Sequence, residues 1–182
     1  MKIALAIGGS SGSIYARILL DRLLSMPGHE ISWVMSANAE VNWKLENENH
    51  SLDRYPFRRY APNDFNAPFA SGSAGYDAMI ICPCSAGLLG RIANGVSDDL
   101  VTRGADVMLK ERKKLVLVFR ETPLNLIHIE NMKKVTLAGG IICPAIPSFY
   151  SHPASIDELA ATVSNRALEL IGLDTGSYRW GG

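Results

Sequence analysis

The chain has 182 residues, a length that suits one domain with one sizeable core. Apolar residues make up 47% of the sequence, and 18 basic residues balance 18 acidic ones. This balance gives no reason to expect a nucleic-acid or membrane-surface partner. No apolar run approaches the roughly 20 residues of a membrane-spanning helix, and no signal peptide is recognisable, so a cytoplasmic protein is expected.

Apolar runs that are typical of buried strands alternate with stretches of helical periodicity. In chain order the pattern predicts a strand at Ile3–Ile7, a helix at Ile14–Leu24, a strand at Ile31–Met35, a helix at Ala37–Leu45, a strand at Ala78–Cys82, helices at Ala86–Ala93 and Asp98–Lys110, a strand at Leu115–Phe119, a helix at Leu126–Leu137, a strand at Gly140–Cys143 and a helix at Ile156–Ile171. Pro83 should end the third strand, and residues 47–76 predict a long loop region that can hold a short strand. We therefore expect a single α/β domain over residues 1–182, with a Rossmann-like (flavodoxin-like) parallel sheet, helices on both faces and a C-terminal tail from about residue 174.

The carboxyl ends of the predicted strands are the expected ligand-binding edge, because open parallel sheets bind ligands there. The segments after the five strands are rich in small or polar residues: Gly9–Gly12, Ser36–Asn38, Cys84–Gly87, Arg120–Thr122 and Pro144–Tyr150. Three of the strand-to-helix junctions carry a serine, which favours one phosphorylated ligand bound by helix N-termini. Simple N-capping by these serines, and a tight turn in the first segment, remain alternatives.

Several charged and aromatic residues have two interpretations. A buried strand delivers Arg120 and Glu121 directly to the expected edge, which predicts a phosphate-binding guanidinium beside an acid–base carboxylate. The alternative for this pair is a surface ion pair. The run Lys110–Lys114 is typical of a solvated helix end and Tyr150 of packing, while Trp180 suits either a docked tail or a lid over a site.

The three cysteines, Cys82, Cys84 and Cys143, predict buried thiols that pack as small apolar groups. Their odd number and the lack of a signal peptide argue against a disulfide framework. No Cys and His residues lie together at metal-ligand spacing, and the four histidines form no Ser-His-Asp pattern. We therefore expect no metal site.

A set of short motifs resembles the UbiX family of flavin prenyltransferases over about residues 2–181. The motifs are Gly9-Ser10-Ser11-Gly12, Val34-Met35-Ser36, Ala70-Ser71-Gly72-Ser73, Cys82-Pro83-Cys84-Ser85, Ala105-Asp106-Val107 with Leu109-Lys110-Glu111-Arg112, Arg120-Glu121-Thr122-Pro123-Leu124, His128 with Glu130-Asn131-Met132, Pro147 with Phe149-Tyr150, and Arg179-Trp180. Each motif alone is modest, whereas their order and spacing together are highly specific.

This resemblance implies an activity and its partners. Such enzymes join the dimethylallyl group of a prenyl monophosphate, in some members a diphosphate, to N5 and C6 of reduced FMN. The product, prenylated FMN, serves partner decarboxylases of the UbiD type as cofactor, and no metal is normally needed. Relatives form dodecamers with sites shared between three subunits, so the resemblance implies a homo-oligomer here.

The resemblance also implies roles for particular residues. Those that would bind FMN are Gly9, Ser10, Ser11, Ser36, Ser85, Ala86, Gly87, Leu88 and Arg120. Those that would bind the prenyl phosphate are Arg103 (from a neighbouring subunit), Lys110, Tyr150 and Arg166, with Trp180 lining the allyl pocket. Those that would be catalytic are Glu46 in the proton steps at the flavin, Glu121 in phosphate departure, and Ser11.

Two positions depart from the family pattern, and two other functions are compatible with the fold. Phe65 stands where a tryptophan can occur in relatives, which affects the shape of the prenyl pocket, and Ser10 replaces a common alanine. Flavin-dependent cysteine decarboxylases have a segment similar to Pro83-Cys84-Ser85, but His50 would have to be their catalytic histidine. A non-catalytic FMN carrier needs no phosphate-binding lysine or arginine, and such carriers are usually acidic. Direct decarboxylation of phenolic acids finds no candidate group.

Overall fold

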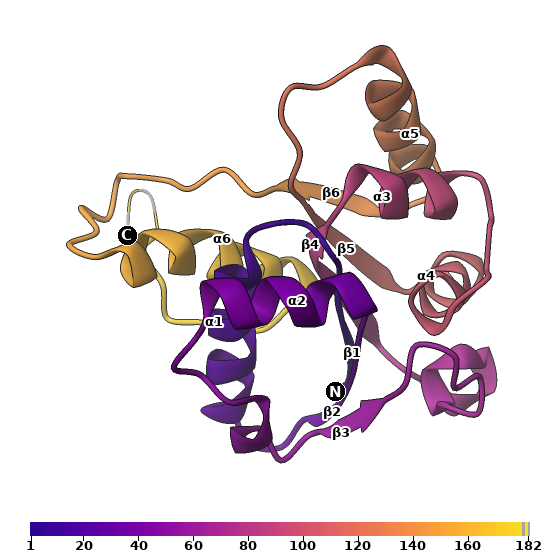
Figure 1. Cartoon of the computed structure of the whole chain (residues 1–182), viewed down its shortest axis with the longest axis horizontal. Coiled ribbons are helices and arrows are strands. Elements are labelled where there is room, and N and C mark those ends of the chain that lie inside the picture. Colours follow the sequence, from indigo (N-terminus) through magenta and orange to yellow (C-terminus); the bar gives the residue numbers. More distant parts are fainter. Residues whose placement is uncertain (180, 182) are drawn as a thin grey trace.

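A six-stranded parallel sheet forms the centre of the computed structural model, which describes residues 1–179 and 181 (Figure 1). The strands are β1 (Lys2–Ile7), β2 (Glu30–Met35), β3 (Arg58–Tyr60), β4 (Ala78–Cys84), β5 (Lys114–Phe119) and β6 (Ile141–Pro144). They lie in the order β3-β2-β1-β4-β5-β6, and each neighbouring pair is parallel. The chain moves outward from β1 to β3 and then crosses to β4, so the carboxyl ends of β1 and β4 form the switch point at which such sheets bind ligands.

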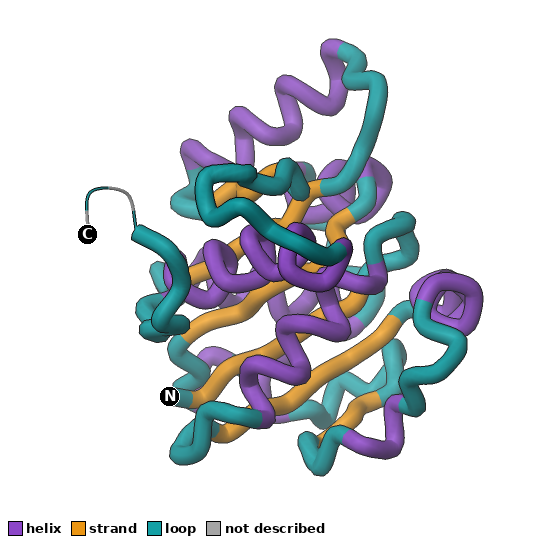
Figure 2. The backbone as a smooth tube through the Cα atoms, turned by 90° about the vertical axis from the view of Figure 1, so that its left-hand side faces the viewer, coloured by secondary structure: helices purple, strands orange, loops and turns teal. Residues whose placement is uncertain are grey.

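Helices cover both faces of this sheet (Figure 2). The helices are α1 (Ser13–Leu24), α2 (Ala37–Glu46), α3 (Ala86–Ala93), α4 (Leu100–Lys110), α5 (Leu126–Leu137) and α6 (Ile156–Ile171). Apolar side chains of α1 and α6 pack on one face of the sheet, and those of α3, α4 and α5 pack on the other. The expected α/β fold with a parallel sheet and helices on both faces is therefore confirmed.

Side chains that alternate along β1 contribute to both apolar layers. Ile3, Leu5 and Ile7 pack toward α1 and α6, whereas Ala4 and Ala6 pack toward α3 and α4. All five side chains are fully buried. Burial on both faces requires a continuous apolar run rather than an alternating one, which is why the strand is recognisable in the sequence. Each large apolar side chain buried in this way stabilises the fold by about 1.5–3 kcal/mol.

The prediction that Pro83 ends the third predicted strand is wrong, because β4 continues through Pro83 to Cys84. Pro83 lacks an N–H, but its carbonyl oxygen still accepts a hydrogen bond from the Gly8 N–H at 3.1 Å. The register with β5 shifts between Ile81 and Cys84, and Cys84 then pairs with Phe119. An irregularity of this kind lets a strand tolerate a proline.

The predicted loop region at residues 47–76 contains more regular structure than the sequence suggests. It holds the short strand β3 and three 3₁₀ turns, at Leu52–Arg54, Pro68–Ala70 and Gly72–Ala74. The helix predicted from Asp98 begins at Leu100 instead. Asp99 is its N-cap, since its Oδ1 accepts a hydrogen bond from the Thr102 N–H at 2.8 Å.

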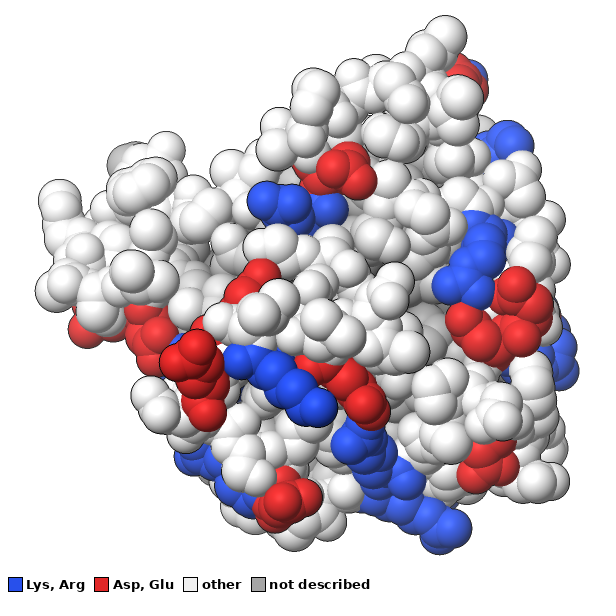
Figure 3. Space-filling view, viewed as in Figure 1, with Lys and Arg blue, Asp and Glu red and all other residues white. Residues whose placement is uncertain are grey.

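Charged side chains of both signs are interspersed over the face shown in Figure 3. Two projecting parts of this face are largely uncharged: α5 with the loop before it, and the segment between β6 and α6. These parts and the first residue of α6 carry exposed large apolar side chains, namely Leu124, Leu126, Ile127, Ile129, Leu137, Ile146, Phe149 and Ile156. Exposed apolar side chains gathered in this way are typical of an interaction surface. Within the described part of the chain, every helix is too short or too polar to cross a membrane.

Candidate active site

The loop between β1 and α1 runs close to two neighbouring elements. A Cβ atom on Gly8 would lie 2.3 Å from the Pro83 carbonyl oxygen, and one on Gly9 would lie 2.6 Å from the Asn38 Cβ atom. Both distances are far below van der Waals contact, so these positions require glycine. The loop therefore rests directly against the end of β4 and the start of α2.

A cavity of about 260 Å³ opens at this meeting point, and we call it the junction cavity. Its lining residues come from four segments: Gly8, Gly9, Ser36, Ala37, Asn38, Ser85, Leu88, Arg91, Asp99 and Val101. The segments that follow β1, β2 and β4 thus converge, which is three of the five segments that the sequence predicted at this edge. Ala86 and Gly87 lie between Ser85 and Leu88 in the first turn of α3.

Ser36 and Ser85 each cap a helix at this cavity. The Ser36 hydroxyl accepts a hydrogen bond from the Ala39 N–H at 3.2 Å, and the Ser85 hydroxyl accepts one from the Leu88 N–H at 3.3 Å. The capping interpretation is therefore correct for both serines. It does not compete with anion binding, because the other N–H groups of each first turn have no partner within the helix.

Ser10 and Ser11 continue the same loop. The Ser10 hydroxyl is buried and, within the described residues, has no hydrogen-bond partner. A buried hydroxyl without a partner costs free energy, so a ligand that hydrogen-bonds to Ser10 would remove this cost. Together with the two glycines that no larger residue could replace, this hydroxyl fits a loop that surrounds a polar ligand.

Glu46, the last residue of α2, reaches across to the N-terminus of α1. Its carboxylate accepts hydrogen bonds from the Gly12 N–H at 2.9 Å, the Ser13 N–H at 2.7 Å and the Ser13 hydroxyl at 2.7 Å. Partial burial raises the pKa of Glu46, but hydrogen bonds from Ser11, Ser13 and the Gly12 N–H outweigh it and hold the pKa below the ordinary glutamate value. Glu46 is therefore a fixed, ionised carboxylate beside the loop.

Arg120 and Glu121 follow β5 at the same edge. The Arg120 N–H donates to the Cys84 carbonyl oxygen at 3.0 Å, and the Arg120 Cγ atom lies 3.9 Å from the position of a Cβ on Gly12. The Glu121 carboxylate accepts a hydrogen bond from the Thr122 N–H at 3.1 Å. In the described chain Arg120 and Glu121 do not pair with each other, so the ion-pair alternative is not supported.

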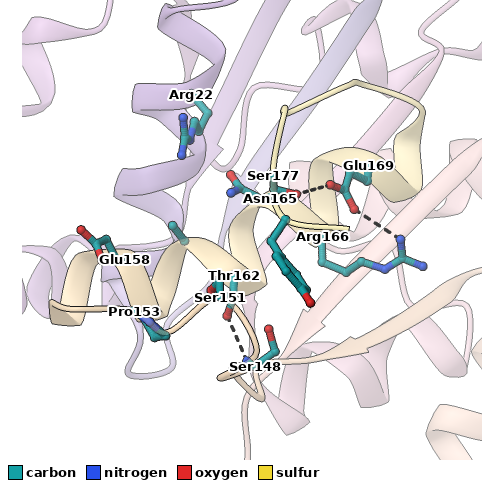
Figure 4. Close-up of a pocket in the computed structure, with 12 residues that line it drawn as sticks. Arg22, Ser148, Ser151, Pro153, Glu158, Thr162, Asn165, Arg166, Glu169 and Ser177 are labelled. Carbon is teal, nitrogen blue, oxygen red and sulfur yellow. Dashed lines mark hydrogen bonds and ion pairs between the residues drawn. The ribbon is translucent and has the colours of Figure 1, made fainter. Parts of the chain in front are cut away.

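Arg166 lies in a second region, formed by α6, the loop before it and the C-terminal tail (Figure 4). Arg166 reaches from α6 to Glu169, with 3.4 Å between its Nη1 and the Glu169 Oε2. It lines a cavity of about 320 Å³ that also includes Ser148 and Tyr178. Tyr150 lines a neighbouring cavity that shares Ser148 and Tyr178 with the first. The structure thus places Arg166 and Tyr150, two of the four predicted prenyl-phosphate residues, around one loop and tail.

Within one chain, Arg103 and Lys110 line neither the junction cavity nor the two cavities beside the loop before α6. Lys110 ends α4 and therefore lies at the amino-terminal edge of the sheet, just before β5, where its Nζ contacts the Glu111 Oε1 at 2.5 Å. The Arg103 Nε donates to the Ala70 carbonyl oxygen at 3.0 Å. Trp180 lies outside the described residues.

Two polar groups, one that lines the junction cavity and one that holds its first loop, were not predicted from the sequence. Arg91 lines it from α3, and its Nη1 contacts the Asp98 Oδ1 at 2.6 Å and the Asp99 Oδ2 at 2.7 Å. The Asn42 amide donates to the Gly9 carbonyl oxygen at 3.0 Å and so holds the loop from α2. Asn42 lies one helical turn after Asn38, and this i, i+4 spacing on an otherwise weakly apolar helix was the available signal.

The buried thiols predicted from the sequence are confirmed, since all three cysteines are buried and free. Burial raises the pKa of Cys84 to about 12 and that of Cys82 well above its ordinary value. These thiols therefore stay protonated near neutral pH and act as packing groups. His50 lies beyond the end of α2, where its ring contacts the Arg54 guanidinium at 3.4 Å.

Known proteins of one family are similar to this chain over its whole length. A family model described as Flavoprotein matches residues 1–168. The chain is 39% identical to "Flavin prenyltransferase UbiX" of Methanocaldococcus jannaschii, over all of this chain and 99% of that protein. It is 41% identical to "Flavin prenyltransferase LpdB" of Lactiplantibacillus plantarum, over all of this chain and 98% of that protein.

Two solved structures are also similar over the whole chain. One is AnUbiX (PadA1) in complex with FMN and dimethylallyl pyrophosphate, with a TM-score of 0.94, 42% identity and coverage of 97% of that chain. The other is a dodecameric FMN-dependent UbiX-like decarboxylase from Escherichia coli O157:H7, with a TM-score of 0.94, 39% identity and full coverage of both chains. The resemblance inferred from the motifs is confirmed, and the chain belongs to the UbiX family of flavin prenyltransferases.

Proposed function

We propose that this protein joins the dimethylallyl group of a prenyl phosphate to N5 and C6 of reduced FMN, which makes prenylated FMN. The observation that carries this proposal is the convergence of the loops after β1, β2 and β4 on the junction cavity. A relative 42% identical over the whole chain was solved with FMN and dimethylallyl pyrophosphate bound. The donor of this chain is accordingly a dimethylallyl phosphate.

The junction cavity suits the phosphate and the polar chain of FMN. The N-termini of α2 and α3 meet there, and their unpaired N–H groups and positive dipole ends attract a phosphate. Ser10, whose buried hydroxyl has no hydrogen-bond partner among the described residues, directly follows the lining residue Gly9. The residues that we assign to FMN binding are Gly9, Ser10, Ser11, Ser36, Ser85, Ala86, Gly87, Leu88 and Arg120.

The prenyl phosphate needs cations and a water-poor site. Breaking the allylic C–O bond leaves negative charge on phosphate, which guanidinium and ammonium groups stabilise more strongly in a site that excludes water. Within one chain, Arg166 and Tyr150 lie around the loop before α6. We assign both residues to the prenyl phosphate, with Glu121 assisting phosphate departure and Trp180 lining the allyl pocket.

Arg103 and Lys110 enter this site from a neighbouring subunit, since within one chain they lie away from it. This requires a homo-oligomer, and we propose a dodecamer. The uncharged projections on α5 and before α6 supply apolar surface for such contacts (Figure 3). One similar solved protein is dodecameric.

Glu46 is the proton acceptor in this proposal. Its carboxylate is ionised near neutral pH, because hydrogen bonds hold its pKa below the ordinary value. An ionised carboxylate can take the proton that the flavin ring loses after prenylation. The product then passes to a partner decarboxylase of the UbiD type.

The proposal is tested by anaerobic incubation of the protein with reduced FMN and dimethylallyl phosphate, followed by mass spectrometry of the released flavin. The expected result is a flavin that has gained one dimethylallyl unit. Glu46→Gln should bind FMN with wild-type affinity and stall prenylation. A flavin that cycles electrons but never changes mass, in the fully assembled protein, would identify a carrier instead.

A further inference from the structure

A continuous chain of hydrogen bonds leads from α1 to the Glu46 carboxylate. The Arg17 Nε donates to the Asn47 Oδ1 at 3.1 Å, and the Asn47 amide nitrogen donates to the Ser13 Oγ at 2.7 Å. The Ser13 hydroxyl then donates to the Glu46 Oε2 at 2.7 Å. Arg17, Asn47 and Ser13 thus form a series of three side chains that ends at the Glu46 carboxylate beside the first loop.

Arginine sets the direction of every bond in this chain. A guanidinium can only donate, so the Asn47 carbonyl oxygen must face Arg17 and the Asn47 amide N–H must face Ser13. The Ser13 oxygen then accepts from Asn47, which directs its own O–H toward Glu46. Successive hydrogen bonds of one direction polarise one another, so that each donor becomes stronger.

These three side chains are buried to an extent that is unusual for polar groups. Ser13 is 1% exposed, Asn47 is 5% exposed and Arg17 is 6% exposed. The Arg17 charge is balanced by Asp157, at 2.6 Å from Nη2, and by Asp21, at 3.6 Å from Nη1. Only the Arg17 side of these pairs is buried, because the Asp21 side chain is 30% exposed and the Asp157 side chain is 61% exposed. The guanidinium is therefore held in place inside the fold, with its Nε directed at Asn47.

We propose that Arg17, Asn47 and Ser13 are positioning residues that hold the Glu46 carboxylate in one orientation and in its ionised form beside the Gly8–Ser13 loop. This inference rests on the proposed function only in naming the flavin as the source of the proton. When that proton leaves its C–H bond in the flavin ring, the electron pair of the bond stays in the ring. Glu46 takes the proton and becomes a neutral carboxylic acid. Loss of the proton to water then restores the carboxylate.

Other charged or titratable groups near Glu46 come from three elements. Tyr15 lies on α1 and interacts electrostatically with both Glu46 and Arg120, which follows β5. Asp157 lies at the start of α6 and reaches Glu46 only through Arg17. None of these groups donates a hydrogen bond to the Glu46 carboxylate within the described residues, whereas Ser13 does so twice.

The test is a carbon-13 NMR titration of the Glu46 carboxyl in the flavin-free protein, with the signal assigned by its loss in Glu46→Gln. Ser13→Ala removes the last donor, and Asn47→Asp keeps the shape but removes the donor to Ser13. In both variants the Glu46 midpoint should rise by about one pH unit, the scale of one hydrogen bond to a charged group. The pH midpoint of the acid limb of the single-turnover prenylation rate should rise by the same amount, with FMN affinity unchanged.

Arg54→Gln is the matched control, because Arg54 also pairs with Asp21, at 3.4 Å, but does not contact Asn47. It should leave the Glu46 midpoint at the wild-type value, whereas Arg17→Gln should raise it. An unchanged midpoint in Ser13→Ala and Asn47→Asp would overturn the inference. If the midpoints rise but wild-type protein never alkylates FMN, the positioning chain stands and the proposed function fails.

Discussion

The close contact between Gly8 in the first loop and Pro83 in β4 offers a quantitative test of the architecture. In Gly8→Ala the new Cβ would lie 2.3 Å from the Pro83 carbonyl oxygen, so the loop or the end of β4 must move. The same movement breaks the 3.1 Å hydrogen bond from the Gly8 N–H to that oxygen. Overpacking costs about 1–3 kcal/mol and the lost hydrogen bond about 1 kcal/mol. We therefore expect the free energy of unfolding to fall by about 2–4 kcal/mol.

Urea unfolding and FMN titration measure the two consequences of this change. Displacement of the loop from the end of β4 should weaken FMN binding by about tenfold or more, equivalent to 1.4 kcal/mol. Gly90→Ala is the control: its Cβ would lie 3.5 Å from the Asn131 amide nitrogen, an ordinary contact, and alanine is the better helix former in α3. An unfolding free energy for Gly8→Ala within about 0.5 kcal/mol of wild type, together with unchanged FMN affinity, would refute the reasoning.

The remaining predictions concern a helix cap, an oligomer surface and an FMN ligand. Burial raises the pKa of Asp99, but hydrogen bonds from Thr102 and Arg91 outweigh it and hold the pKa below the ordinary value. The ionised Asp99 carboxylate therefore stabilises the folded protein above the unfolded-state pKa, and this stabilisation is lost as pH falls through the folded-state pKa. Asp99→Ala should therefore cost about 1–2 kcal/mol at pH 7 and less near pH 3 in urea unfolding, and a deficit independent of pH would contradict this. Replacing Leu126 and Ile127, which are 71% and 70% exposed, with serine should yield smaller assemblies in light scattering without loss of protomer stability; an unchanged particle mass would exclude α5 from the interface. Arg120→Lys should weaken FMN binding about tenfold, because lysine lacks the planar fork of donors, and equal affinity would remove Arg120 from the FMN site.

Much of the fold could be predicted because the central strands are buried on both faces. Runs such as Ile3–Ile7 and Leu115–Phe119 are apolar without interruption, which a parallel sheet requires. The edge strand β3 has no such run, and only Tyr60 in it is buried. Arg58 and Arg59 lie over the rings of Tyr60 and Trp33, each 5.0 Å from the ring centroid. Pairing with β2 and these contacts, rather than local pattern, make it a strand.

The site was predictable where it depends on strand order and less so where it depends on helix placement. Ser36 and Ser85 follow strands that the topology places next to β1, so their convergence follows from the sheet. The contacts of Ser13 with Glu46 and Asn47 depend on how α2 packs against α1, which no spacing in the sequence specifies. Lys110 belongs to a helix that ends at the opposite edge, so only its surroundings in an assembly decide its role.

In the proposed function, the strand ends around β1 and β4 form one flavin site that a neighbouring subunit completes. The most direct measurement is an experimental structure of the assembled protein with FMN and dimethylallyl phosphate bound. We expect the FMN phosphate in the junction cavity, with the prenyl phosphate held by Arg166 and Tyr150 of one subunit and by Lys110 and Arg103 of another. Flavin bound elsewhere, or a prenyl phosphate that no Lys110 of any subunit approaches, would contradict it.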